Sequence, residues 1–165
     1  MIEVVPNLFV GSGIDEQRLR GQEGWFFIHA CKEPYHRQAL GYTGRSAAKN
    51  HPEYLIAQRP GRFILNLVDV DNPDYIPKDV IDTALEAIRD NIDANKILLH
   101  CNQGQSRSPG IALLYLLKYT NLLPKSDINS ASEAFRVIYP PYNPALGVRE
   151  YIRLNWRYYA QDNKQ

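Results

Sequence analysis

The sequence predicts an α/β fold in which a central twisted mixed sheet is flanked by helices. Short apolar segments of strand composition come early in the chain, whereas apolar residues recur at helical spacing over most of the later part. A strand, a polar loop and an apolar helix also follow one another in "KILLHCNQGQSRSPGIALLYLLKY", an order typical of α/β proteins. Because 165 residues suit one domain, we expect a single domain over residues 1–165, with an inserted loop at about residues 32–60.

Four short segments are predicted to be strands. "NLFVGS" ends in a Gly-Ser turn, and "WFFIHA" has the composition of a second strand. "RFILNLV" is apolar nearly throughout, which indicates a strand buried on both faces, and "KILL" is the last of the four. Residues 32–60 lack sustained periodicity, so we expect a long loop that is functional or carries short structure of its own. "DVDNPDYIP" is expected to be a turn-rich loop.

Four helices are predicted in the later part of the chain, over residues 77–92, 108–119, 130–139 and 143–159. Pro77 suits the first position of a helix, and the segment from residue 108 is apolar on nearly all sides, as in a central buried helix. Ser130 and Glu133 form an S-x-x-E capping box. Asn143 and Pro144 are predicted as the N-cap and first residue of the last helix.

The composition argues against several classes of partner and location. A formal net charge of +1 gives no global electrostatic attraction to nucleic acid, and we expect no nucleic-acid partner. The opening "MIEVVPNLFVGSG" lacks the pattern of a secretory signal, and the longest apolar run, residues 111–117, is too short to cross a bilayer. Two cysteines seventy residues apart make no disulfide framework, so we expect a cytoplasmic protein without a membrane partner. The oligomeric state is not indicated.

Charge is spread unevenly along the chain. Residues 31–62 contain six Lys or Arg and two acids, whereas residues 69–93 contain eight acids and two bases. The first segment could present a basic surface to an anionic partner, with Lys32, His36, Arg37 or Arg45 binding a second anionic group of a substrate. Two differently charged solvated faces, with a variable surface loop, would explain the same pattern. The sequence leaves both interpretations open.

The segment between "KILL" and the apolar helix has the features of a phosphate-binding loop. A helix N-terminus presents amides without intrahelical partners beside the positive end of its dipole, so a loop curled around it can bind an anion. Gly104 permits a tight curl, because glycine tolerates backbone angles that a Cβ forbids. The other loop residues are polar and carry no negative charge: Asn102, Gln103, Gln105 and Ser106.

Cys101 and Arg107 frame this loop and suggest its chemistry. A helix N-terminus and a nearby cation favour the thiolate of Cys101, which could attack phosphorus and form a phosphocysteine. The planar fork of Arg107 matches two phosphoryl oxygens. The Ser108 hydroxyl could assist sulfur as it leaves, and His100 would set the geometry of the loop. A bare C-x5-R is a weak signal and fits a buried inert cysteine as well; the full string H-C-x-x-G-x-S-R-S is a strong one.

The string "HCNQGQSRS" resembles the signature loop of the cysteine-dependent protein phosphatases, in the dual-specificity branch. "NLFVGS", "FIHACKEP" and "YPPYNPALGVREYIRL" resemble other segments of that branch, whereas residues 32–60 match nothing in it. The resemblance implies a dual-specificity/tyrosine phosphatase-like fold, no metal or other cofactor, and a phosphorylated protein or small phosphorylated molecule as substrate. Because the loop has no lysine, highly charged inositol lipids are less favoured.

In that family an upstream aspartate protonates the leaving oxygen. Asp69, Asp71 and Asp74 precede Cys101 by 32, 30 and 27 residues. Asp69 has the spacing expected from the resemblance and is preferred, Asp71 stays open, and Asp74 is disfavoured. Taken singly, each aspartate would also suit a turn.

Three further alternatives follow from the resemblance and the loop. Cys31 falls where lipid-directed relatives similar to the tensin homologue carry a second cysteine, so it is either a reversible disulfide partner of Cys101 or a plain buried thiol. A non-catalytic phosphate-recognition module, or pseudophosphatase, could use the same loop for binding only. Sulfur transfer through a persulfide is a third possibility, against which the full string argues.

Overall fold

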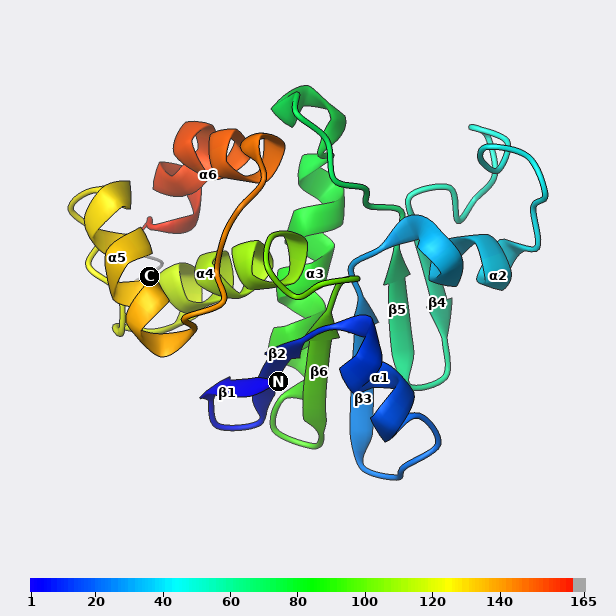
Figure 1. The fold of residues 1–165 in the computed structure, drawn as a ribbon, viewed down its shortest axis with the longest axis horizontal. Coiled ribbons are helices and arrows are strands. Elements are labelled where there is room, and N and C mark those ends of the chain that lie inside the picture. The colour runs from blue at the N-terminus through cyan, green and yellow to red at the C-terminus, as the bar shows by residue number, and fades with distance from the viewer. Residues whose placement is uncertain (162–165) are drawn as a thin grey trace.

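The computed structural model describes residues 1–161 and confirms the predicted α/β class, with a six-stranded mixed sheet flanked by helices. Its strands are β1 (Ile2–Val5), β2 (Leu8–Gly11), β3 (Trp25–His29), β4 (Ile56–Arg59), β5 (Arg62–Leu65) and β6 (Lys96–His100). The order across the sheet is β1-β2-β6-β3-β5-β4. The four inner strands are parallel, and β1 and β4 pair antiparallel at the two edges. β6 is therefore central, and so is the loop that follows it (Figure 1).

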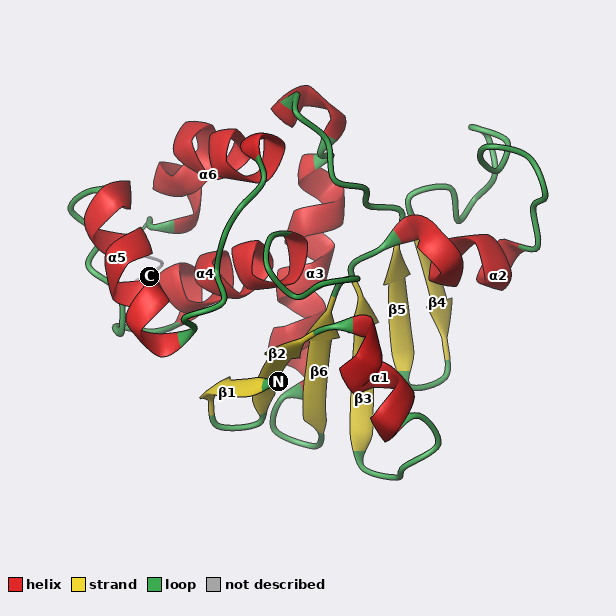
Figure 2. Cartoon of the chain, viewed as in Figure 1, coloured by secondary structure: helices red, strands yellow, loops and turns green. Residues whose placement is uncertain are grey.

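Helices cover both faces of this sheet (Figure 2). They are α1 (Gly13–Leu19), α2 (Arg37–Leu40), α3 (Lys78–Asn91), α4 (Arg107–Tyr119), α5 (Ile128–Ile138) and α6 (Leu146–Tyr159). α3 and α4 pack against one face, α5 and α6 pack on α4, and α1 lies on the opposite face (Figure 1). Every residue of α4 from Arg107 to Leu117 is buried, as predicted for the central helix. No helix within residues 1–161 is long and apolar enough to span a membrane.

All four predicted helix starts differ from the structure. α3 begins at Lys78 with Pro77 as its N-cap, and α4 begins at Arg107, each one residue from the prediction. The starts of α5 and α6 are wrong by two residues or more, because side chains and the neighbouring loop hold the backbone differently. α5 begins at Ile128, and its N-cap is Asp127, whose carboxylate accepts the amide of Ser130 at 2.8 Å. α6 begins at Leu146 instead of Pro144. The amide of Asn143 is used in a tertiary hydrogen bond to the loop after β6, so the segment before α6 stays extended.

β1 and α1 were not predicted. The Ser12 amide donates to the Asp15 carboxylate at 2.9 Å, which completes a capping box at the start of α1. The S-x-x-D spacing of "SGID" was a usable signal for this helix. α1 directly follows β2, and β2 pairs with β6 in the sheet. α1 therefore lies beside the loop that follows β6.

Residues 32–60, predicted to be an inserted loop, carry short structure of their own: a kinked turn over Lys32–His36 in which Glu33 is not helical, α2 and the edge strand β4. His36 is fully buried and hydrogen-bonds the Tyr42 hydroxyl at 3.0 Å and the Glu53 carbonyl at 2.8 Å. The Arg37 guanidinium donates to the Glu33 carboxylate at 2.6 Å. Lys32 also donates to the carbonyl of Arg45, while the Arg45 side chain is exposed. Three of the four suggested anion-binding side chains thus hold this segment together: His36, Arg37 and Lys32.

Candidate active site

The loop after β6 curls tightly because Gly104 adopts a left-handed backbone with φ of 73°. A Cβ at this position would lie 2.8 Å from the carbonyl oxygen of Gly11, so the curl also requires the absence of a side chain. Other elements hold the outer side of the loop: the Tyr139 hydroxyl donates to the Gly104 carbonyl at 2.6 Å, and the Asn143 amide donates to the Gln105 carbonyl at 2.8 Å. These contacts hold the loop in its curled shape.

The carbonyls of Asn102, Gly104 and Gln105 in this loop accept hydrogen bonds from other elements, whereas the loop amides make none with the described residues. Within residues 1–161, the backbone N–H groups of residues 102–106 donate no hydrogen bond to another protein group. They precede the N-terminus of α4, where the helix dipole adds partial positive charge. A run of free amides around a helix N-terminus is an anion-binding arrangement.

The Arg107 guanidinium is buried, with 7% of the residue exposed, and is held on three sides. It donates to the Leu67 carbonyl at 3.1 Å and to the Asn102 side-chain oxygen at 2.8 Å, and it pairs with the Asp69 carboxylate at 3.2 Å. Its Nε–H is buried and has no hydrogen-bond partner among the described residues. A buried donor left unpaired is costly, so this group suits an anion that accepts a hydrogen bond.

Cys101 is the first residue after β6, and only 2% of it is exposed. Its Sγ lies 3.2 Å from Oγ of Ser108, which is itself 3.2 Å from the Gly11 carbonyl oxygen. The hydroxyl has one proton and two acceptors within reach, the carbonyl and the sulfur. By rotating its O–H bond, the Ser108 hydroxyl can therefore donate to the sulfur when the sulfur becomes negatively charged.

The structure brings one of the three candidate acids to the guanidinium. Asp69 is half exposed and contacts Arg107. Asp71 is exposed and makes no hydrogen bond with the described residues, while Asp74 lies in a short helical turn over Pro73–Tyr75. All three follow the end of β5 at Leu65, so Asp69 belongs to a loop and not to the strand itself.

Gly147 positions this acidic loop, although the sequence reasoning did not single it out. Its amide donates to the Val70 carbonyl at 2.9 Å, and a Cβ at Gly147 would clash with that same carbonyl. The sequence held a weak signal, because a glycine within the helical pattern "LGVREYIRL" costs about 1 kcal/mol relative to alanine. The close approach of α6 to Val70 fixes the segment between Asp69 and Asp71.

A pair of buried histidines lies behind Cys101. His29 Nδ1 and His100 Nε2 are 2.6 Å apart, and His100 Nδ1 lies 3.2 Å from the Cys101 carbonyl oxygen. Burial lowers the pKa of His100 to about 4 and that of His29 to about 2, so both rings are neutral at pH 7. A carbonyl can only accept, so His100 carries its proton on Nδ1 and accepts from His29 on Nε2. His100 thus contacts the start of the loop from behind, and its role in setting the loop geometry stays a prediction.

Glu16 joins these histidines in the one group of potential metal ligands within residues 1–161. One ligand atom from each of Glu16, His29 and His100 lies within 4.8 Å of the others, and all three residues are buried. Their donor atoms are already engaged: the carboxylate accepts from Arg20 at 2.9 Å and from the Tyr35 hydroxyl at 2.7 Å, and the histidines bond each other. A cation would have to displace the Arg20 guanidinium, so we assign no metal here.

The histidine pair should make folding stability depend on pH. An unfolded His100 binds a proton below its ordinary pKa near 6.5, whereas the folded ring stays neutral until about pH 4. The unfolded state therefore holds more protons in this window, and the free energy of unfolding should fall by up to about 1.4 kcal/mol per pH unit as the pH drops from 6.5. Urea unfolding of the parent and His100→Asn at pH 7, 6 and 5 would measure this. The variant should show the shallower dependence; equal slopes would contradict the assignment.

Cys31 is fully buried at the end of β3, one residue beyond the point where the Ala30 amide donates to the His100 carbonyl at 2.8 Å. Both cysteines thus lie beyond the carboxyl ends of the neighbouring parallel strands β3 and β6, and both are free thiols. Burial raises the pKa of Cys31 to about 12. The raised pKa keeps Cys31 protonated at pH 7, and the two alternatives for it, reversible disulfide partner of Cys101 or plain buried thiol, both stay predictions.

No protein-family profile and no curated protein sequence matches this chain. Solved structures do match over nearly its whole length. DUSP15 is 21% identical over 96% of this chain and 89% of its own, with a TM-score of 0.60. A leucine-rich-repeat and phosphatase-domain protein from Entamoeba histolytica is 14% identical over 99% and 95%, with a TM-score of 0.63. The human tyrosine phosphatase-like serine/threonine/tyrosine-interacting protein is 18% identical over 96% and 97%, with a TM-score of 0.59. The predicted fold of the dual-specificity phosphatases is therefore confirmed.

Proposed function

We propose that this chain, which has the dual-specificity phosphatase fold, hydrolyses phosphomonoesters through a phosphocysteine intermediate. One observation carries the proposal: the five consecutive amides of residues 102–106 and the Nε–H of Arg107 make no hydrogen bond with the described residues, and they directly follow Cys101 in the loop after β6. These donors match the oxygens of a phosphoryl group and would stabilise the charge that develops on them during transfer.

The first step transfers the phosphoryl group to the enzyme. The Cys101 thiolate attacks phosphorus while the amides and Arg107 hold the three non-bridging oxygens. The bond from phosphorus to the ester oxygen breaks, and a carboxylic acid donates a proton to that oxygen. Asp69 is our first choice for this acid, because it contacts Arg107 and so lies beside the proposed phosphate-binding site. Asp71 is the alternative.

The second step regenerates the thiolate. Water attacks the phosphocysteine, the same aspartate takes a proton from it, and the phosphorus–sulfur bond breaks to release inorganic phosphate. The electron pair returns to sulfur as Ser108 donates its hydrogen bond. Phosphotyrosine, phosphoserine and phosphothreonine in proteins, or small phosphorylated molecules, are the substrates we propose.

Trapping the intermediate tests this proposal. In Ser108→Ala the sulfur loses a donor as it leaves, so hydrolysis of the phosphocysteine should slow by about 10–100-fold. Stopped-flow hydrolysis of p-nitrophenyl phosphate should then show a burst of nitrophenol near one equivalent per enzyme. Rapid denaturation and peptide mass spectrometry should find the phosphoryl group on Cys101. A phosphoryl group on another residue, or turnover with no covalent intermediate, would contradict the mechanism.

The two candidate acids can be separated by the leaving group of the substrate. Losing the general acid should lower kcat by about 10²–10⁴-fold for a poor leaving group such as an alkyl alcohol, and less for nitrophenol, which leaves without a proton. We expect this pattern in Asp69→Asn and near-parent rates in Asp71→Asn. Steady-state rates with phosphothreonine peptide and p-nitrophenyl phosphate would measure it, and the reverse result would assign the role to Asp71.

A non-catalytic phosphate-recognition module is the second candidate function. The human neighbour named phosphatase-like and interacting gives it specific support. Such a protein would bind a phosphorylated partner through the same loop and Arg107 without hydrolysing it. Binding of phosphopeptides by the parent, with no release of phosphate over hours, would favour this alternative.

A further inference from the structure

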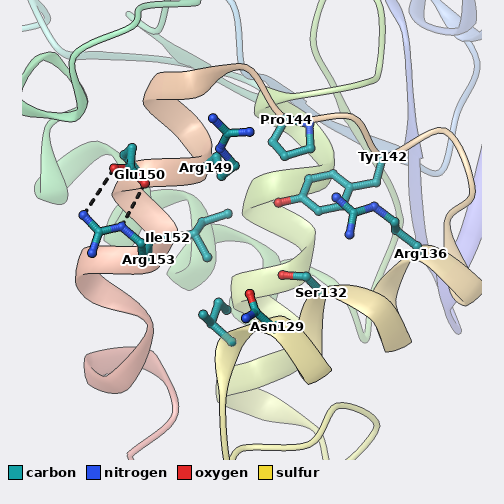
Figure 3. Close-up of a pocket in the computed structure, with 10 residues that line it drawn as sticks. Asn129, Ser132, Arg136, Tyr142, Pro144, Arg149, Glu150, Ile152 and Arg153 are labelled. Atoms are coloured by element: carbon teal, nitrogen blue, oxygen red, sulfur yellow. Dashed lines mark hydrogen bonds and ion pairs between the residues drawn. The ribbon is translucent and has the colours of Figure 1, made fainter.

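A cavity of about 250 Å³ lies between α5 and α6, apart from the phosphate-binding loop. Three arginines and one glutamate line it, so its wall carries a net positive charge of two: Arg136, Arg149, Arg153 and Glu150. Asn129 and Ser132 on α5 add uncharged hydrogen-bonding groups. Figure 3 shows that these side chains come from two facing helices. We call this cavity the α5–α6 groove.

Only one of the three arginines is neutralised by a carboxylate among the described residues. Arg153 donates to Glu150 at 2.8 and 3.2 Å, as the dashed lines in Figure 3 mark. Within residues 1–161, Arg136 and Arg149 form no ion pair. The Arg136 guanidinium lies 5.3 Å from the centre of the Tyr142 ring, a cation–π contact that orients it without cancelling its charge.

The groove adjoins the proposed active site through a single stretch of chain, residues 142–145. Tyr142 and Pro144 line the groove, and their neighbours contact the phosphate-binding loop. The Asn143 amide donates to the Gln105 carbonyl at 2.8 Å, and the Ala145 amide donates to Ser106 Oγ at 2.9 Å. In Figure 1 this stretch runs from α5 to α6 beside the start of α4. A substrate held by the loop could therefore extend into the groove.

We propose that the α5–α6 groove binds an acidic segment of a phosphorylated protein substrate, next to the phosphorylated residue. This inference rests on the proposed phosphatase function and adds the substrate class. Two unpaired guanidinium groups fit carboxylates in a bidentate manner, which a single lysine could not do. Net positive charge beside the active site would also speed the encounter with acidic proteins. The sequence indicated a basic surface on residues 31–62, but this positive groove is built from a different part of the chain.

Matched peptides test the assignment. Each pair would share one phosphorylated residue, phosphotyrosine or phosphothreonine, and differ only in flanking glutamates against glutamines. For the parent, kcat/KM should be about tenfold higher for the acidic peptide, and 0.5 M NaCl should reduce that preference. The double variant Arg136→Gln, Arg149→Gln should lose the preference and keep the parent rate on p-nitrophenyl phosphate. The double variant Glu150→Gln, Arg153→Gln, which removes the neutral ion pair as a whole, is the matched control and should keep the preference.

Several outcomes would overturn the inference while leaving the proposed function intact. Equal kcat/KM for both peptides in the parent would do so, as would a preference that survives in the double variant. A third peptide, with a second phosphoserine in place of the glutamates, distinguishes the source of the anion. If kcat/KM were raised only for the peptide with a second phosphoserine, the proposal that the groove binds carboxylates would be wrong.

Failure of the proposed function would look different. No phosphate would be released from any substrate, p-nitrophenyl phosphate included. The groove would then be tested by fluorescence anisotropy with the same labelled peptides on Cys101→Ser and on Cys101→Ser carrying the two arginine changes. About tenfold tighter binding of the acidic peptide that disappears with the arginines supports the groove. Equal binding of both peptides overturns it.

Discussion

Cys101→Ser should lower kcat for p-nitrophenyl phosphate by at least about 10⁴-fold while leaving the fold and phosphate binding in place. Serine is nearly isosteric with cysteine, so the buried position between β6 and α4 tolerates it. Its hydroxyl, however, is far less nucleophilic than a thiolate at neutral pH. The free amides and Arg107 are unchanged, so calorimetric binding of tungstate should persist. Activity near the parent level would exclude the phosphocysteine mechanism.

The other cysteine supplies the control for this experiment. Cys31 is also buried, lies at the same edge of the sheet and has no role in the proposed chemistry. Cys31→Ser should therefore retain most of the activity once the fraction of folded protein is measured. If Cys31→Ser and Cys101→Ser lost activity equally without unfolding, the distinction between nucleophile and structural thiol would be wrong.

The position of the loop proposed to bind phosphate could be predicted because its determinants are local. The strand, Gly104, Arg107 and the apolar helix follow one another within one stretch of sequence, and the structure places the loop between β6 and α4. The apolar runs likewise identified β2, β3, β5 and β6, since burial on both faces leaves a continuous apolar pattern. Local signals were enough where neighbours in sequence are also neighbours in space.

The partners that hold the loop could not be predicted, because they depend on the arrangement of whole elements. His29 meets His100 only because β3 and β6 are adjacent parallel strands with these two residues in register. The loop likewise takes a hydroxyl from Tyr139 and an amide from Asn143, and the second contact is what delays the start of α6. Capping rules describe an isolated helix end, and here a tertiary hydrogen bond overrides them.

Arg107→Lys should lower kcat/KM by about 10²–10³-fold, the usual effect of removing a hydrogen-bond donor that stabilises the transition state. The guanidinium already donates to the Leu67 carbonyl and to Asn102, and still has a free Nε–H for a phosphoryl oxygen. An ammonium group has only three donors and no planar fork, so it cannot keep both protein contacts and also bind two phosphoryl oxygens. Lysine keeps the positive charge of Arg107 and loses only the planar guanidinium. The variant therefore separates the effect of hydrogen-bond geometry from the effect of charge.

The split between kcat and KM makes this second result informative. If Arg107 mainly binds the ground state, KM for p-nitrophenyl phosphate should rise and kcat should stay near the parent value. We expect kcat to carry most of the loss, because the charge on the equatorial oxygens is what the fork and the amides stabilise as the phosphoryl group moves to sulfur. Arg153→Lys, at an exposed arginine paired with Glu150, should change neither constant. Rates within tenfold of the parent would mean that a single positive charge suffices, and the bidentate role assigned to Arg107 would have to be abandoned.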